Sequence, residues 1–153
     1  MRMSRTYEYK IRLAFRNSTF DPKVISAALR MRPHVAWRVG DRRMTPSGQL
    51  LEGFRRESHW SKTMTPRGIW VRAEVGSSRM AERGIQKLIH QLTPHAAFLR
   101  RLRAAGASPE IWLSSRSQDN YPLQIEPELC KTLERLGMTL IIDIYPYEQR
   151  GSR

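Results

Sequence analysis

The chain has 153 residues, of which 40% are hydrophobic and 27% are charged, a balance typical of one folded domain that excludes a disordered chain. No apolar stretch approaches the roughly 20 residues that span a bilayer, and the N-terminus lacks the apolar segment of a signal peptide, so no membrane partner is expected. The net charge of +13 suggests a polyanion or an acidic protein as a partner, although a high-GC genome, which favours arginine codons, would give the same surplus without selection for binding.

A single cysteine, Cys130, rules out an internal disulfide and fits a reducing cytoplasm. We therefore predict a cytoplasmic protein with one domain over 1–153, an ordered core at about 6–147 and a disordered tail at 148–153. Cys130 itself is expected to be a small buried hydrophobic residue of a helix rather than a nucleophile. Composition does not fix the oligomeric state.

The sequence patterns of the first strands and the first helix are clear. Apolar and polar residues alternate over 7–15, which predicts a half-buried strand. Asp21 followed by Pro22 offers an N-cap and a first helical position, so a short helix is expected there. Residues 34–39 then predict a short strand that carries Trp37.

The middle of the chain is less regular. Residues 41–57 follow neither a strand nor a helix period and are predicted to be irregular. Alternation predicts a strand at 68–75. Helical spacing follows over 78–92, with Ser78 as a cap, and Thr93-Pro94 predicts the start of a second helix.

The last part of the chain completes the expected fold. The second helix should end at Gly106, and a strand at 110–114 and a helix at 127–136 follow. The most apolar run, 138–145, predicts a central strand. This order predicts an α+β fold, in which helices cover one face of a mixed, largely antiparallel sheet, with a ferredoxin-like core and additions.

The sequence lacks the common motifs of nucleotide-binding and catalytic sites. The sequence has no glycine-rich nucleotide fingerprint, no P-loop lysine motif and no nucleophile elbow. Asp143 lies in the apolar last strand, where we expect it to pair with an arginine in a structural role. Isolated histidines without metal-like spacing are usually structural. They are His34, His59, His90 and His95. We therefore expect no metal, no cofactor and no catalytic residue, and the pattern favours a protein that is not an enzyme.

Arginines and tryptophans are interleaved between residues 37 and 72. Base stacking combined with phosphate contact is physically available there, but no established RNA- or DNA-binding motif is present. A basic surface with tryptophan also suits an acidic protein patch. The residues expected to bind a ligand or partner are Trp37, Asp41, Arg42, Arg43, Arg55, Arg56, His59 and Trp60.

A spaced pattern of Trp, Gly and Thr-Pro residues marks the same region. Its members are Arg32-Pro33, Trp37, Gly40-Asp41, Arg43, Thr45-Pro46, Gly48, Leu51, Gly53, Arg56, Ser58 and Trp60, and later Leu92-Thr93-Pro94-His95, Leu99, Leu102, Leu136-Gly137, Leu140, Asp143 and Tyr145. Over about residues 6–147 this pattern resembles the bacterial family called domain of unknown function 4279. The chain departs from it at His59, where an aromatic residue such as tyrosine is expected, and at 61–67, a variable insertion. The resemblance supports the fold and the compartment and implies no activity or cofactor.

Three functions remain open at this point. The first is a non-enzymatic bacterial binding module that contacts an acidic protein through a basic, tryptophan-containing surface. The second is binding of RNA or single-stranded DNA. The third is a small anionic ligand or an enzyme site at the 41–60 loop, held by Arg43, Arg56 and His59. We expect this loop to be ordered, anchored by Trp60 and Leu51, and to form one wall of the binding site.

Overall fold

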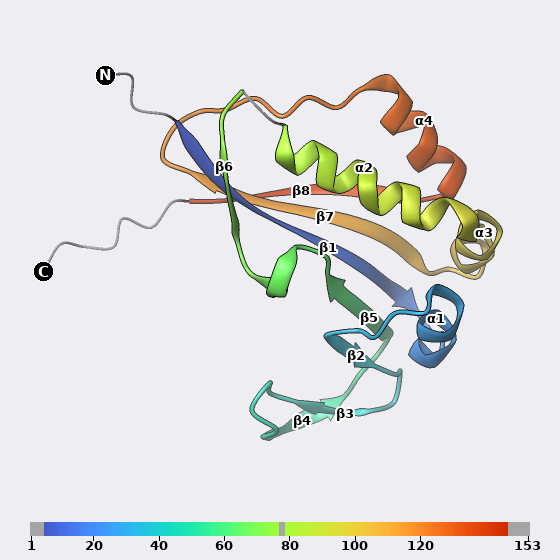
Figure 1. The fold of residues 1–153 in the computed structure, drawn as a ribbon. Coiled ribbons are helices and arrows are strands. Elements are labelled where there is room, and N and C mark those ends of the chain that lie inside the picture. Colours follow the sequence, from blue (N-terminus) through green and yellow to red (C-terminus); the bar gives the residue numbers. More distant parts are fainter. Residues whose placement is uncertain (1–4, 77–78, 147–153) are drawn as a thin grey trace, which may run out of the picture.

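The computed structural model describes residues 5–76 and 79–146, which form a six-stranded sheet, a two-stranded hairpin and helices (Figure 1). The predicted tail at 148–153 and the predicted cap Ser78 lie outside these residues. The strands are β1 (Thr6–Ser18), β2 (Val35–Trp37), β3 (Arg42–Met44), β4 (Leu50–Phe54), β5 (Ser58–Thr63), β6 (Val71–Glu74), β7 (Ser108–Ser117) and β8 (Thr139–Tyr145). The α-helices are α1 (Pro22–Leu29), α2 (Met80–Leu92), α3 (Ala96–Ala104) and α4 (Pro127–Leu136), with 3-10 turns at Pro66–Gly68 and Thr93–His95.

The long strand β1 organises the sheet, whose order is β2-β5-β1-β7-β8. One edge of β1 pairs antiparallel with β7 along most of its length, and the other edge pairs first with β6 and then with β5. Among the described residues only β7 and β8 pair in parallel, and α4 connects them. The predicted α+β class with a mixed, largely antiparallel sheet is therefore confirmed. Within that class, one detail differs from the ferredoxin-like unit: β7 and β8 are direct neighbours, whereas a split β-α-β unit has another strand between them.

The helices cover one face of this sheet, as predicted, while β2 to β5 lie on the far side of β1 from α2 (Figure 1). Helix α2 packs on β1 so closely that a Cβ added at Gly84 would lie 2.5 Å from Cδ1 of Ile11. The absence of a side chain at Gly84 therefore permits this approach. The layer between sheet and helices is the main core, and its largest fully buried side chains include Leu13, Phe15, Trp60, Ile85, Leu99, Ile111 and Leu113.

Local sequence signals set several helix ends. The carboxylate of Asp21 accepts a hydrogen bond from the backbone N–H of Lys23 at 2.9 Å and caps α1 as predicted. The expected break at Thr93-Pro94 separates α2 from α3. Helix α4 has the predicted bounds and ends at Gly137, whose φ of 66° is a conformation that glycine adopts readily.

The prediction that residues 41–57 are irregular was wrong, because β3 and β4 form a hairpin there. Every residue of the two strands is exposed, so no alternation of apolar and polar residues is required and none appears. Gly48, with a φ of 89°, closes the turn by donating its N–H to the carbonyl of Thr45. Leu51 is 38% exposed and does not anchor this segment, contrary to expectation.

Two further expectations for the C-terminal part were wrong. The run predicted as a central strand is β8, an edge strand of the described sheet. Its apolar content does not reflect burial on both faces, because Ile144 is 74% exposed. Cys130 is exposed rather than buried, since the buried face of α4 is formed by Leu129, Leu133 and Leu136.

Candidate binding face of the sheet

The face of the sheet opposite the helices carries basic and aromatic side chains, and we call it the helix-free face. Side chains alternate along a strand, so the residues between the core positions of β1 and β7 point to this face. On β5, Ser61 pairs with Ala14 of β1, and His59 pairs with Trp37 of β2. The side chains of Trp37, His59 and Ser61 therefore lie on this side of the sheet too. The helix-free face consists of Glu8, Lys10, Arg12, Arg16, Trp37, His59, Trp70, Glu110, Trp112 and Arg116.

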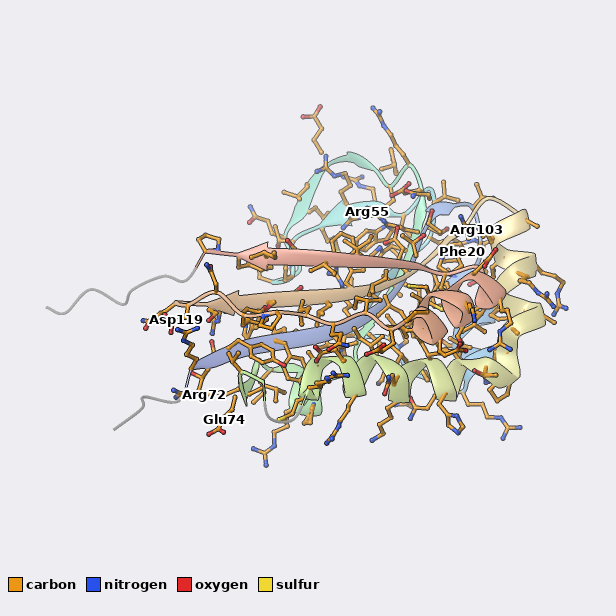
Figure 2. The ribbon with its side chains drawn as sticks, turned by 90° about the horizontal axis from the view of Figure 1, so that it is seen from above. Phe20, Arg55, Arg72, Glu74, Arg103 and Asp119 are labelled. Carbon is orange, nitrogen blue, oxygen red and sulfur yellow. The ribbon has the colours of Figure 1, made fainter. Side chains whose placement is uncertain are left out.

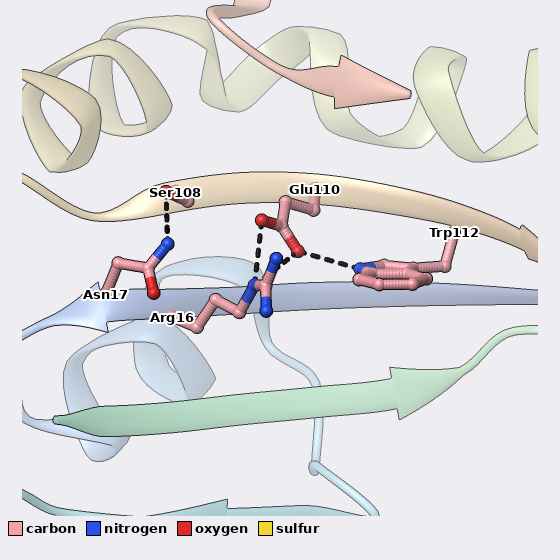
Figure 3. Close-up of polar contacts among 5 residues, drawn as sticks. All are labelled: Arg16, Asn17, Ser108, Glu110 and Trp112. Atoms are coloured by element: carbon pink, nitrogen blue, oxygen red, sulfur yellow. Dashed lines mark hydrogen bonds and ion pairs between the residues drawn. The ribbon is translucent and has the colours of Figure 1, made fainter. Parts of the chain in front are cut away.

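The centre of this face is Trp112 on β7, which lies opposite Arg12 of β1. The guanidinium carbons of Arg12 and Arg16 lie 4.8 Å and 5.4 Å from the centre of its ring. The indole N–H donates to Glu110 at 2.7 Å, and Arg16 donates to both oxygens of the same carboxylate at 2.9 Å (Figure 3). Glu110 is only 4% exposed, so this ion pair fixes Arg16 and the indole in place.

A second stack surrounds Trp70, just before β6. The Lys10 ammonium and the Arg116 guanidinium lie 5.2 Å and 4.5 Å from its ring centre, and Arg116 also pairs with Glu8. The ring of Tyr145 meets Trp70 edge to face at 5.8 Å. The face therefore continues from β7 across β1 to β6.

Asp143 does not have the arginine partner that the sequence suggested. The neighbouring Asp143 carboxylate raises the pKa of Tyr145. Within residues 5–76 and 79–146 no arginine forms an ion pair with Asp143. Asp143 is half-buried on an edge strand, where water can solvate its carboxylate without an ion pair.

The third stack joins β2, β5 and the end of the hairpin. The ring of Trp37 stacks on His59 at 4.4 Å with an interplanar angle of 18°. The guanidinium carbon of Arg55 lies 3.8 Å from the Trp37 ring centre. Seen from above, Arg55 lies beside the hairpin, away from Arg72 and Glu74 (Figure 2).

The pKa of His59 reflects both its burial and the charged groups around it. Burial lowers the pKa of His59 to about 4, and the cations of Arg12, Arg16 and Arg55 contribute, opposed by the carboxylate of Glu110. The imidazole is therefore neutral at pH 7, with Nε2 3.0 Å from the Ser61 hydroxyl. Three guanidiniums from two parts of the chain thus act on one ring.

The structure brings together three of the residues predicted to bind a partner: Trp37, Arg55 and His59. Arg42 and Arg43 lie on β3, where Arg42 covers the Phe54 ring at 5.6 Å. The remaining predicted residues, Asp41, Arg56 and Trp60, do not belong to these stacks.

Arg56 is exposed beyond the end of β4. Asp41 is in a turn, where its carboxylate accepts the N–H of Arg38 at 2.7 Å. Trp60 lies on the helix side of the sheet, is 0% exposed, meets Phe15 edge to face and donates to the Ser26 hydroxyl. Trp60 therefore anchors the segment, as predicted, and its side chain offers no surface for contact.

The sequence-based prediction missed most of the helix-free face, because it named only Trp37 and His59 of its ten residues. Arg12, Arg16, Trp112 and Arg116 were not among the predicted site residues, because strand pairing between β1 and β7 brings them together across about a hundred positions of sequence. A signal existed: the polar residues that alternate with the core positions of β1 are mostly basic.

A polar cavity of about 360 Å³ lies elsewhere, between α2 and the segment before α4. Its wall is a network in which Arg79 donates to Gln124 and Glu126, while Glu82 accepts the N–H of Gln124. These bonds tie the segment to α2, which is a structural role.

The described residues include no group of three or more possible ligands that could hold a metal ion. Among the same residues, every helix is too short or too polar to cross a bilayer. The chemistry that the helix-free face offers is therefore recognition of negative charge by guanidinium groups held over indole rings.

Comparison with known proteins agrees with the resemblance noted from the sequence. No curated protein and no solved structure matches the chain. The model of one family, described as "Domain of unknown function (DUF4279)", matches residues 7–147. That span includes β1 from Tyr7 onward, the hairpin and β8, so it covers the core and the helix-free face together. The chain belongs to the family DUF4279.

Proposed function

We propose that this protein is a bacterial, non-enzymatic binding module that contacts an acidic protein through the helix-free face. The observation that carries the proposal is the set of basic side chains stacked on Trp37, Trp70 and Trp112. A guanidinium held over an indole ring has lost much of its freedom before binding, so less entropy is lost when it meets a carboxylate.

The positive charge of the chain and of the helix-free face supports an acidic protein as the partner. The chain carries +13 at pH 7, and the helix-free face has more cations than carboxylates. Such a surface speeds encounter with a negatively charged protein and excludes positively charged ones. The single cysteine is consistent with a partner in the reducing cytoplasm.

The same stacks argue against the alternative of RNA or single-stranded DNA. Base recognition by a sheet uses aromatic rings whose faces are open to stacking. Here each of the three rings already carries a guanidinium, an ammonium or an imidazole over it. A base would have to displace that group first, whereas a carboxylate binds to the outer edge of the guanidinium without displacing it.

The test is a binding titration with the full chain. A fluorescein-labelled glutamate-rich peptide is compared with a glutamine-rich peptide of the same length and with oligo-dT of the same charge. We expect the acidic peptide to bind best and its affinity to fall with salt. The double variant Arg12→Gln, Arg116→Gln should weaken peptide binding about tenfold or more, because two charged contacts are lost.

The double variant Lys87→Gln, Arg101→Gln is the matched control, since both residues are exposed cations of α2 and α3 on the helix side. It also removes two positive charges, without touching the helix-free face, and should change affinity far less. Equal losses in the double variant and the control would mean that net charge, not this face, drives binding. Tighter binding of oligo-dT than of the acidic peptide would favour the nucleic-acid alternative instead.

A further inference from the structure

The strand β8 forms one edge of the six-stranded sheet. Within residues 5–76 and 79–146 it is bonded to β7 alone, in a parallel register that runs without a shift from Thr139 to Tyr145. Seen from above, it is the outermost of the strands β1, β7 and β8 (Figure 2). The strands at the other edge, β2 and β6, have only three and four residues. The edge at β8 is therefore long and regular, and the outward N–H and C=O groups of its backbone pair with no described strand.

Pairing with β7 shows which side chains of β8 face the helices. Ile142 lies opposite Leu113, which is completely buried in the core, so Ile142 points to the helix side. Leu140 and Ile144, two positions away on either side, point the same way. Leu140 packs against the core, but Ile142 is 41% exposed and Ile144 is 74% exposed. The helices thus leave the outer part of this apolar row uncovered.

The charge of β8 differs from that of the rest of the chain. Residues 139–145 contain no lysine or arginine and only one carboxylate, Asp143, in a chain with a net charge of +13. Long edge strands are usually protected by lysine, proline or a bulge, and none of these interrupts β8. An acidic partner is attracted to the arginines of the helix-free face instead. Two copies of this basic chain repel each other least where they meet at β8, so a second copy is the occupant that suits this edge.

We infer that β8 pairs antiparallel with β8 of a second copy, centred on Ile142, so that the two sheets join into one. This symmetry places the two Ile142 side chains opposite each other, and Ile144 of each copy opposite Leu140 of the other. Asp143 faces Ile141, so the two carboxylates are not directly opposed. Because the pairing occupies the β8 edge of both copies, assembly stops at a dimer.

This inference does not rest on the proposed function. Edge-to-edge pairing leaves both faces of the sheet uncovered, and it places the helix-free faces of the two copies side by side in one sheet. Binding of the glutamate-rich peptide therefore tests the helix-free face, while the oligomeric state without peptide tests the β8 edge.

The experiment is sedimentation equilibrium of the full chain from about 1 to 200 µM, because a short strand interface is expected to dissociate in the micromolar range. Ile144→Lys should raise the dissociation constant of the dimer about tenfold or more, since it places a cation against the apolar Leu140. Leu50→Lys is the matched control, because Leu50 is an exposed residue of β4 and the change adds the same charge. It should dimerise like the native chain. Circular dichroism shows that each variant is folded.

Disulfide crosslinking tests the register of the pairing. The exposed Cys130 is first removed by Cys130→Ser. In this background Ile142→Cys should link two copies on oxidation, because the Cα atoms of a central antiparallel pair lie about 4.5 to 5.5 Å apart, within the range of a disulfide. Ile144→Cys should not, since its two copies are offset by four residues along the strands, roughly 14 Å.

A dimer that Ile144→Lys weakens and Ile142→Cys links supports the inference. Equal weakening by Leu50→Lys, or a crosslink from Ile144→Cys as strong as that from Ile142→Cys, overturns it. Oligomers that grow with concentration also overturn it, because they indicate head-to-tail pairing of β8 with another edge. A chain that stays monomeric at every concentration and still binds the glutamate-rich peptide overturns this inference and leaves the proposed function standing.

Discussion

The two faces of the central sheet are built from the same strands and do different things. On β7, Ile111 and Leu113 point towards the helices and are completely buried, while Trp112 between them points to the helix-free face. On β1, Leu13 is buried and its neighbour Arg12 lies over that tryptophan. Because side chains alternate along a strand, one stretch of sequence provides both the core and the proposed recognition surface. Neighbouring substitutions should therefore separate stability from binding.

The largest effect should come from the helix side. Ile111→Ala leaves a cavity in a fully buried position and should lower the free energy of unfolding by about 2–5 kcal/mol. Urea denaturation measures the loss, and peptide binding by the folded fraction should be unchanged. Trp112→Ala, one residue away, should lose less stability and most of the binding. If both variants lost binding equally, the two faces would not be separable.

A smaller effect is expected at the ion pair that holds the helix-free face. Glu110→Gln removes the charge that Arg16 and Trp112 share, and should cost about 1–2 kcal/mol in a urea titration, because Arg16 is partly exposed and can turn to water. The same change releases the Arg16 guanidinium, so we expect the acidic peptide to bind a few times more tightly. Weaker binding would show that the orientation of Arg16 matters more than its free charge.

The sequence predicts those strands and helices whose signals lie within a few neighbouring residues. Alternation over 7–15 correctly predicted β1, and Asp21-Pro22 correctly predicted the start of α1, because strand period and capping act within a few residues. The hairpin at 42–54 was missed, since none of its strand residues is buried and its turns depend on glycine conformation.

The candidate site was predicted only in part, for a related reason. Trp37, Arg55 and His59 lie within one short region of sequence and were recognised by composition. Arg12 and Trp112 meet only through the pairing of β1 with β7, and no local pattern contains that register. Trp60 was wrongly included for the same local reason. It follows His59 in the sequence, which suggested a surface role, but its side chain is buried in the core.

The smallest predicted effect is on pH dependence, and it again concerns only the helix-free face. The pKa of His59 is about 4 in the folded chain and about 6.5 in an unfolded chain. The unfolded state therefore binds more protons between these values, so this residue's contribution to stability is complete above about pH 6.5 and is lost as the pH falls towards 4.

The groups that face His59 are Arg12 and Arg16 of β1, Arg55 after the hairpin and Glu110 of β7. His59→Gln should reduce the fall in urea midpoint between pH 7 and pH 5 relative to the native chain. His90→Gln, a change at an exposed histidine of α2, should leave that fall unchanged. A native-like fall in His59→Gln would contradict the assignment of a low pKa to His59.

The four tryptophans report separately on the helix-free face and on the core. The indole N–H groups of Trp37, Trp70 and Trp112 belong to the helix-free face, while that of Trp60 is in the core and donates to Ser26. Their NMR signals can be followed while the glutamate-rich peptide is added to the full chain. If the helix-free face binds the peptide, the signals of Trp37, Trp70 and Trp112 should move together and saturate, while that of Trp60 stays in place. Movement of Trp60 to the same extent, or saturation with the three face signals unmoved, would contradict binding at the helix-free face.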